Sequence, residues 1–197
     1  LGIAYLLQAD PLGALEIFEA VTRLDPKYAD GWVNVARARI ANADFDGARV
    51  ALDAARRVRP GFLKARYFDG EIAMREARFA EAEAAFLDVL ASWPRERMAL
   101  RLLARALYEQ DRCDEALGVL DRLFALDPED ARGWFEATRA LRRLGRRKEA
   151  KEAEARFNAY REDDDEPVRR GRALLERPDL QRLAQPIHVH TAPSVAR

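Results

Sequence analysis

Two histidines near the end of the chain have the type and spacing that suit metal chemistry best. His188 and His190 alternate with Ile187 and Val189 after Pro186, so in an extended chain both imidazoles point to the same side. Such a pair could ligate a metal ion or the iron of a porphyrin. Metal centres in proteins usually take more donors, and no cysteine or second pair of histidines or carboxylates lies nearby at metal spacing. We therefore predict no metal site and no cofactor, and interpret both as surface histidines.

The single cysteine, Cys113, is the candidate nucleophile. It precedes an expected helix, where the helix dipole can activate a thiol. His188 and His190 are remote from it, and the sequence contains neither a serine nucleophile elbow nor a glycine-rich phosphate loop. We predict a plain turn residue at Cys113, no catalytic residues, and a protein that is not an enzyme. One cysteine cannot form an internal disulfide, so it indicates no redox compartment.

The elements that must position any functional residue follow from a repeat of 34 residues. Prolines mark the period, and small and large apolar residues form further columns in the same register. The prolines are Pro26, Pro60, Pro94 and Pro128; one small column is Ala14, Ala48, Ala82, Ala116 and Ala150; a second is Gly2, Ala36, Gly70 and Ala104; the large column is Phe18, Leu52, Phe86 and Leu120; and Trp32 recurs as Trp134.

These columns resemble the tetratricopeptide repeat, whose signature is Trp, then Leu-Gly, Tyr, a later Ala, a Phe four residues on and a Pro near the end. The resemblance covers roughly residues 1–161. The first copy matches in order through Leu1, Gly2, Tyr5, Ala14, Phe18 and Pro26. The fold class implied is all-α, a right-handed α-solenoid of stacked helix–turn–helix hairpins.

The columns also have direct physical meanings. Gly or Ala is needed where two helices cross closely, and the large column fills the space beside that crossing. Proline follows a helix end because it cannot continue the helix. Apolar residues at helical spacing predict helices, and Asp10, Asp25 and Asp127, each followed by proline, are expected to cap helix starts. The predicted helices are 1–8, 12–24, 30–42, 46–58, 64–76, 80–92, 98–110, 114–126, 132–144 and 148–161.

Departures from the pattern define the expected domain boundaries. Arg66 and Asp69 replace the Trp and Leu of the third repeat, so its first helix should pack less well. Glu154 replaces the large apolar residue of the fifth repeat, which suits a terminal unit. The first repeat lacks its leading turns, from which we infer a fragment of a longer chain. We predict an array over residues 1–161, with five repeats of which the first is truncated and the fifth degenerate, and an acidic linker and C-terminal capping tail over residues 162–197.

Charge and hydropathy narrow the partner class. Lys plus Arg and Asp plus Glu both total 34, so no net field attracts a polyanion, and we predict no nucleic acid partner. No stretch approaches the roughly 20 apolar residues of a membrane helix, so we predict no membrane insertion. The 30 Arg against four Lys, with abundant Ala, suggest a bacterium. The localisation stays open between the bacterial cytoplasm and the periplasm.

In the family that the chain resembles, the first helix of each repeat lines a concave groove that holds peptides. Projected by the period, this face interleaves cations with aromatic residues. Arginine pairs with carboxylates and Tyr and Phe supply rigid contact area, so the face suits an acidic or amphipathic segment, although pairs with acidic residues of the array itself could neutralise some cations. The predicted groove residues are Arg37, Lys64, Tyr67, Arg101, Arg105, Tyr108, Phe135 and Arg139.

The predicted function is a scaffold that binds a protein or peptide segment in this groove. A clamp for chaperone C-termini, found in a subset of the family, is incomplete here: Asn34 and Lys64 match single positions, whereas Ile3 and Phe68 occupy others. The alternative is an accessory module of an exported bacterial multihaem cytochrome or other electron-transfer enzyme, because the ending Pro186 to His190 is similar to that of such proteins. No haem-attachment motif occurs in this sequence, so that alternative concerns a part missing here.

Overall fold

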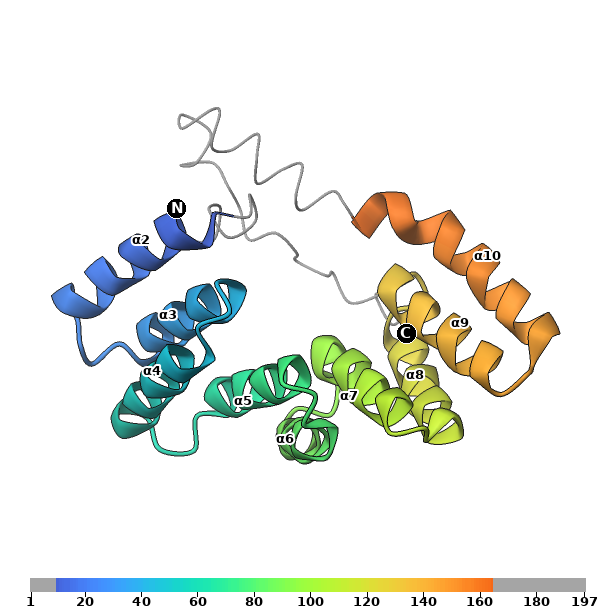
Figure 1. The fold of residues 1–197 in the computed structure, drawn as a ribbon, viewed down its shortest axis with the longest axis horizontal. Helices are drawn as coiled ribbons and strands as arrows, with labels where there is room; N and C mark the ends of the chain where they lie inside the picture. Colours follow the sequence, from blue (N-terminus) through green and yellow to red (C-terminus); the bar gives the residue numbers. More distant parts are fainter. Residues whose placement is uncertain (1–9, 165–197) are drawn as a thin grey trace, which may run out of the picture.

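The protein is an all-α solenoid of repeated hairpins (Figure 1). The structure, a computed structural model, describes residues 10–164, and within that range every regular element is an α-helix. The helices match the predicted ranges to within one residue, except that α10 continues to Asp164. They are α2 Pro11–Leu24, α3 Ala29–Ala41, α4 Phe45–Val58, α5 Leu63–Arg75, α6 Phe79–Ser92, α7 Arg97–Glu109, α8 Cys113–Leu126, α9 Ala131–Arg143 and α10 Arg147–Asp164.

The helices follow an arc from α2 at one end to α10 at the other (Figure 1). The first helices of the repeats, α3, α5, α7 and α9, lie along its inner side, and α4 and α6 lie on its outer side. Each helix packs mainly against its neighbours in the chain, with additional contacts between successive first helices. This arrangement is expected of a repeat array, because each unit buries its apolar face only against the next.

The columns of small and large residues form the core. The alanines of the small column are at most 3% exposed from Ala14 to Ala150, and the large column is at most 6% exposed from Phe18 to Leu120. At Gly70 a Cβ atom would lie 2.8 Å from the ring of Phe86. The residue at this crossing must therefore be small, as the columns predict.

The turn inside each hairpin repeats one backbone conformation. Ala43, Ala77, Asp111 and Gly145, which are 34 residues apart, have φ values of 59°, 58°, 64° and 73°. Only the last is glycine, although the left-handed region is unfavourable for other residues. The surrounding hairpin therefore imposes this turn on whatever residue occupies it.

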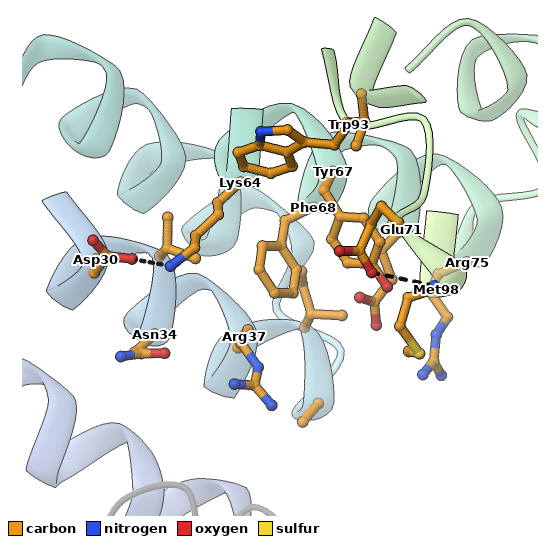
Figure 2. Close-up of a pocket in the computed structure, with 15 residues that line it drawn as sticks. Asp30, Asn34, Arg37, Lys64, Tyr67, Phe68, Glu71, Arg75, Trp93 and Met98 are labelled. Atoms are coloured by element: carbon orange, nitrogen blue, oxygen red, sulfur yellow. Dashed lines mark hydrogen bonds and ion pairs between the residues drawn. The ribbon is translucent and has the colours of Figure 1, made fainter. Parts of the chain in front are cut away.

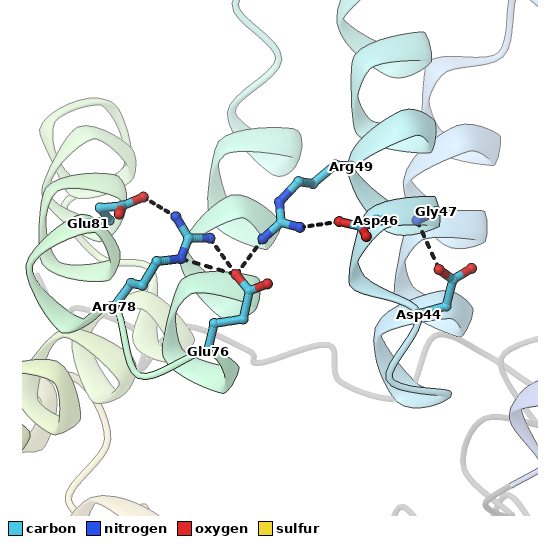
Figure 3. A network of polar contacts seen from close by, with 7 residues as sticks. All are labelled: Asp44, Asp46, Gly47, Arg49, Glu76, Arg78 and Glu81. Carbon is cyan, nitrogen blue, oxygen red and sulfur yellow. Dashed lines mark hydrogen bonds and ion pairs between the residues drawn. The ribbon is translucent and has the colours of Figure 1, made fainter.

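The second helices use two different devices at their N-termini (Figure 3). Asp10 and Asp44 accept hydrogen bonds from the backbone N–H groups of Gly13 and Gly47, both at 2.9 Å, which satisfies one free donor of each helix. In the later repeats arginine occupies this position and pairs with a glutamate three residues on. These pairs are Arg78–Glu81, Arg112–Glu115 and Arg146–Glu149.

Two of the predicted caps are wrong. Asp25 and Asp127 follow the ends of α2 and α8, and each accepts a hydrogen bond from the backbone N–H two residues later, at 3.1 and 3.2 Å. They stabilise the turn between hairpins, which occupies several residues before the following helix begins. The residue that caps α9 is Asp130, whose side chain accepts from Gly133 N.

The core divides within the third repeat. One cluster of buried residues runs from Ala14 to Ile72 and the other from Ala73 to Ala153, so the boundary lies inside α5. The polar substitutions of that helix form ion pairs instead of apolar contacts: Arg66 with Asp88, at 2.8 Å, and Asp69 with Arg56. The boundary thus falls on the helix for which the sequence predicts poorer packing.

Some sequence predictions fall outside the described residues. These are the helix of residues 1–8, the tail from residue 165 onward and the two histidines, His188 and His190. Among the described helices, none combines the length and apolar character needed to cross a membrane.

Candidate binding groove

The inner side of the arc holds a cavity of about 540 Å³, here called the first groove (Figure 2). Residues of α3 and α5 line it together with the end of α6, the start of α7 and the segment that joins them. Phe68 and Tyr67 project into it from α5, and Trp93 and Met98 lie on the side of the α6–α7 segment. The remaining lining residues are Asp30, Val33, Asn34, Arg37, Ile40, Ala41, Lys64, Glu71, Arg75, Val89 and Glu96.

A second cavity of about 430 Å³, the second groove, continues along the inner side between α5, α7 and α9. It shares Tyr67, Glu71, Arg75 and Met98 with the first groove, so the two form one concave surface. Its other lining residues are Met74, Arg101, Leu102, Arg105, Arg132, Phe135 and Glu136.

The concave surface contains most of the predicted groove residues. The residues that line the first groove are Arg37, Lys64 and Tyr67. Those that line the second are Tyr67, Arg101, Arg105 and Phe135. Tyr108 and Arg139 line neither groove.

Several predicted cations are neutralised by the array itself. Lys64 pairs with Asp30 of the preceding repeat. One nitrogen of Arg101 lies 2.9 and 3.0 Å from the two carboxylate oxygens of Asp130, and these side chains are only 13% and 8% exposed. Because loss of either member of such a buried pair would leave the other charge uncompensated, Arg101 is part of the scaffold.

Arg139 is likewise paired with carboxylates of the array. It donates hydrogen bonds to Glu109 at 2.9 Å and Glu136 at 2.8 Å. Its guanidinium also lies 4.1 Å from the centre of the Tyr108 ring, and Arg143 lies 4.0 Å from the same ring. Tyr108 thus makes cation–π contacts with two arginines of the next repeat, which tie α7 to α9.

Other arginines of the surface have no such partner. Within residues 10–161, no carboxylate lies at ion-pairing distance from Arg37, Arg75 or Arg105. Arg75 and Arg105 are exposed, and Arg37 is half-buried. These three guanidinium groups are the ones that can pair with carboxylates of another molecule.

Glu71 lies at the junction of the two grooves. Burial raises the pKa of its carboxyl group, and the charges of Arg75 and Arg37 oppose that rise. Burial also raises the pKa of the neighbouring Tyr67. The Tyr67 ring packs edge-on against the ring of Phe68, with 5.1 Å between the ring centres. The junction is therefore a poorly hydrated place where one carboxyl group is opposed by the charges of two arginines.

Three groove residues discussed here were missed from the sequence: Arg75, Trp93 and Met98. Glu71 was placed on the inward-facing face as an acidic residue that could neutralise nearby cations. Met98 lies in the column of Lys64, and Arg75 lies one helical turn beyond Glu71, so the period could have found both. Trp93 follows the end of α6, outside the first helices, and the projection of first helices could not include it. Trp93 and Met98 are 41% and 44% exposed, as Phe135 is at 45%.

The candidate nucleophile is inaccessible. Cys113 is the first residue of α8 and only 3% exposed, and burial raises the pKa of its thiol. The thiol therefore lacks the activation that a reactive cysteine needs. In the part of the chain that the structure describes, no three His, Cys, Asp or Glu residues gather as metal ligands would.

Solved structures with the same arrangement of helices confirm the fold. MamA 41-end from Desulfovibrio magneticus RS-1 aligns with a TM-score of 0.67 and 19% identity, over 83% of this chain and 93% of that one. The nearly identical TPR-like repeats named for a kinesin light chain of Podosopora anserina align with a TM-score of 0.63 and 20% identity, over 84% and 93%. At these identities the likeness concerns the fold alone. No curated protein matches the sequence.

Matches to family models assign the chain to a family, which the solved structures alone do not. Models described as tetratricopeptide repeat match residues 5–67 and, in two overlapping matches, residues 70–131 and 101–167. The matches span both halves of the array and include the helices that line both grooves. The chain belongs to the tetratricopeptide-repeat family.

Proposed function

We propose that the protein is a scaffold whose concave surface binds a segment of a partner protein. One observation carries the proposal: Arg37, Arg75 and Arg105 form no ion pair within residues 10–161, and they line the same concave surface as the exposed apolar side chains of Trp93 and Met98. Unpaired guanidinium groups next to apolar surface favour a partner that supplies carboxylates and apolar contacts together. The partner expected is therefore acidic or amphipathic.

Membership of the family supports the same function, because stacked hairpins create extended concave surfaces that such proteins use for binding. The predicted set of groove residues needs revision before it is tested. Arg101 and Arg139 hold neighbouring repeats together, so reversing their charge would disturb the fold as well as the surface. The alternative of an accessory module for an electron-transfer enzyme gains no support from the described residues, and stays a prediction.

The test is a capture experiment from an extract of the source organism. The intact chain is compared with a variant that carries Arg37→Glu, Arg75→Glu and Arg105→Glu. The control carries Arg57→Glu, Arg122→Glu and Arg147→Glu, which are exposed arginines on second helices and line neither groove. Both variants change the net charge equally.

We expect partners recovered by the intact chain to be lost from the groove variant and retained by the control. Circular dichroism at 222 nm, a wavelength that reports helix content, must show the same folding for all three proteins. Equal recovery by the groove variant would remove the proposal. Equal loss in the control would show that only the total charge matters.

A further inference from the structure

The two grooves differ in chemistry, and this difference defines a partner more narrowly than acidic character does. In the first groove, Phe68, Trp93 and Met98 offer aromatic and thioether surface (Figure 2), and the buried side chains of Val33 and Val89 also line it. Exposed aromatic rings that border a concave apolar surface are typical sites for one large anchoring side chain. Lys64, which lines this groove from α5, pairs with Asp30, and Asp30 also contacts Arg59 at 3.8 Å. Arg37 of α3, which also lines this groove, forms no ion pair within residues 10–161.

The second groove has a cationic character. Arg75 and Arg105 are exposed there and have no carboxylate partner within residues 10–161. They project from α5 and α7, so one extended segment can meet both in succession. Carboxylates are the side chains that complement them, because each guanidinium presents a fork of donors to a carboxylate.

The junction between the grooves has the opposite preference. Glu71 lines both cavities, is mostly withdrawn from solvent and has only Arg37 and Arg75 as nearby opposite charges. A partner carboxylate placed against Glu71 itself would bring a like charge next to a poorly hydrated carboxyl group, and only Arg37 and Arg75 would offset that repulsion. An amide, a hydroxyl or a bare backbone would meet no such cost.

We propose that the concave surface recognises a bipartite segment of a separate protein: a bulky apolar side chain in the first groove, carboxylates against Arg75 and Arg105 in the second, and an uncharged link over Glu71. This inference rests on the proposed function and specifies its ligand. The acidic half of the segment complements the charges of Arg75 and Arg105, and the apolar half complements the aromatic surface of the first groove. Glu71 determines that the link between the two halves is uncharged. Glu71 is thus a specificity-determining residue.

The probes are fluorescein-labelled peptides with one phenylalanine and a block of four glutamates, separated by zero to six serines. Matched peptides replace the phenylalanine by serine, the glutamates by glutamines, or the central serine by glutamate. Affinity for the full chain is measured by fluorescence anisotropy at low salt, because screening weakens exposed ion pairs. One spacer length should bind best.

Pairing peptide changes with protein changes tests each contact, since coupling appears only between groups that interact. Trp93→Ala should weaken the phenylalanine peptide about tenfold and leave the serine peptide unchanged, which corresponds to a moderate hot spot. Arg105→Ala should weaken the glutamate peptide by a similar factor and leave the glutamine peptide unchanged. Purely additive losses would overturn the bipartite assignment.

The junction has its own test. The intact chain should bind the peptide with a central glutamate about fivefold more weakly than the one with a central serine, as expected for a like charge brought to a buried carboxylate. Glu71→Gln keeps the shape of the side chain and should abolish this discrimination. If the central glutamate lowers peptide affinity by the same factor in both proteins, Glu71 does not determine specificity.

Failure of this inference is distinguishable from failure of the proposed function. If the Arg37, Arg75 and Arg105 reversal leaves binding of every peptide unchanged, the concave surface binds none of them and both proposals fall. If the reversal abolishes binding but no coupling appears, only the bipartite ligand is wrong.

Two other occupants of the concave surface would rule out a separate partner protein. Neutralising Asp163, Asp164, Asp165 and Glu166 to amides in the full chain should not change probe affinity; a tenfold gain would assign the groove to the chain's own acidic stretch. Sedimentation velocity should show no self-association that Arg105→Glu removes. If it does, the occupant is a second copy of this chain.

Discussion

The ring of Phe86 packs against the backbone of Gly70, so closely that a Cβ atom there would lie 2.8 Å from Cε1 and 2.9 Å from Cζ. The repeat shows a matching of sizes at this crossing. Where the small column has Gly70, the large column has Phe86, and where it has Ala36 or Ala104, the large column has Leu52 or Leu120. Glycine therefore accompanies phenylalanine and alanine accompanies leucine.

This matching predicts a compensating pair of mutations. Gly70→Ala alone should destabilise the protein by about 1–3 kcal/mol, because the added methyl group overpacks the ring. Phe86→Leu alone should cost about 1–2 kcal/mol through the space it leaves. The double variant reproduces the combination found in the flanking repeats and should recover most of the loss. Urea denaturation of the four proteins gives the coupling, and additive losses would show that the two sites are independent.

A second prediction separates scaffold arginines from surface arginines. Arg101→Ala removes the partner of a carboxylate that is 8% exposed, Asp130, and should lower the free energy of unfolding by about 2–3 kcal/mol. Arg105→Ala, one helical turn later and exposed, should change it by less than about 0.5 kcal/mol. Thermal denaturation compares them directly. Equal destabilisation would mean that Arg105 also has a structural role.

A third prediction concerns the third repeat. Trp32 and Trp134 donate hydrogen bonds from Nε1 to the carbonyl oxygens of Pro26 and Pro128, at 2.9 and 2.8 Å. Pro60 stands six residues before Arg66 in the same register, so Arg66→Trp should restore the missing bond.

The expected gain is about 1 kcal/mol, since a typical hydrogen bond outweighs the exposed Arg66–Asp88 pair that is lost. Arg66→Ala is the control, because it loses the ion pair without gaining the indole. Chemical denaturation should therefore rank the tryptophan variant above the parent and the alanine variant slightly below it. A tryptophan variant no more stable than the alanine one would contradict the prediction.

A fourth prediction uses two carboxylates with opposite pKa shifts. The pKa of Glu71 is raised by burial, so its folded form holds a proton more tightly and its ionisation destabilises the protein above the unfolded value of 4.5. The pKa of Glu76 is lowered by hydrogen bonds from Arg49 and Arg78, so its charge contributes stability above that value, which is lost as pH falls through the lowered pKa.

Stability measured in urea from about pH 2 to 8 distinguishes the two groups, because their windows lie on opposite sides of 4.5. Glu71→Gln should gain stability over the parent as the pH rises above 4.5, whereas Glu76→Gln should lose it as the pH rises through the lowered pKa toward 4.5. The two difference curves should converge at the acid end of the range. Parallel curves would show that neither shift affects folding.

The sequence predicted the positions of the helices because the columns at 34 residues combine packing and turn signals at every repeat. It did not predict which cations are free. The partners of Lys64, Arg101 and Arg139 lie 34, 29 and 30 residues away, in neighbouring repeats. Such pairs depend on how two hairpins are rotated against each other, which a column of residue types does not specify.

The wrong caps at Asp25 and Asp127 have a related cause. Aspartate before proline is a good start signal in isolation, and Asp10 does cap α2. Between hairpins the chain first makes a turn of several residues, so the same dipeptide stabilises the turn and not the helix. The environment of a motif within the repeat, and not the motif alone, decided its role.

The left-handed turns at Ala43, Ala77, Asp111 and Gly145 make the hairpins modular. Because each turn has the same backbone conformation whatever its side chain, the change of direction between the paired helices is nearly constant along the array. A further hairpin spliced in at one of these turns would continue the existing curvature. Recognition surfaces of greater reach can therefore arise by duplication of whole units, without redesign of the ones already present.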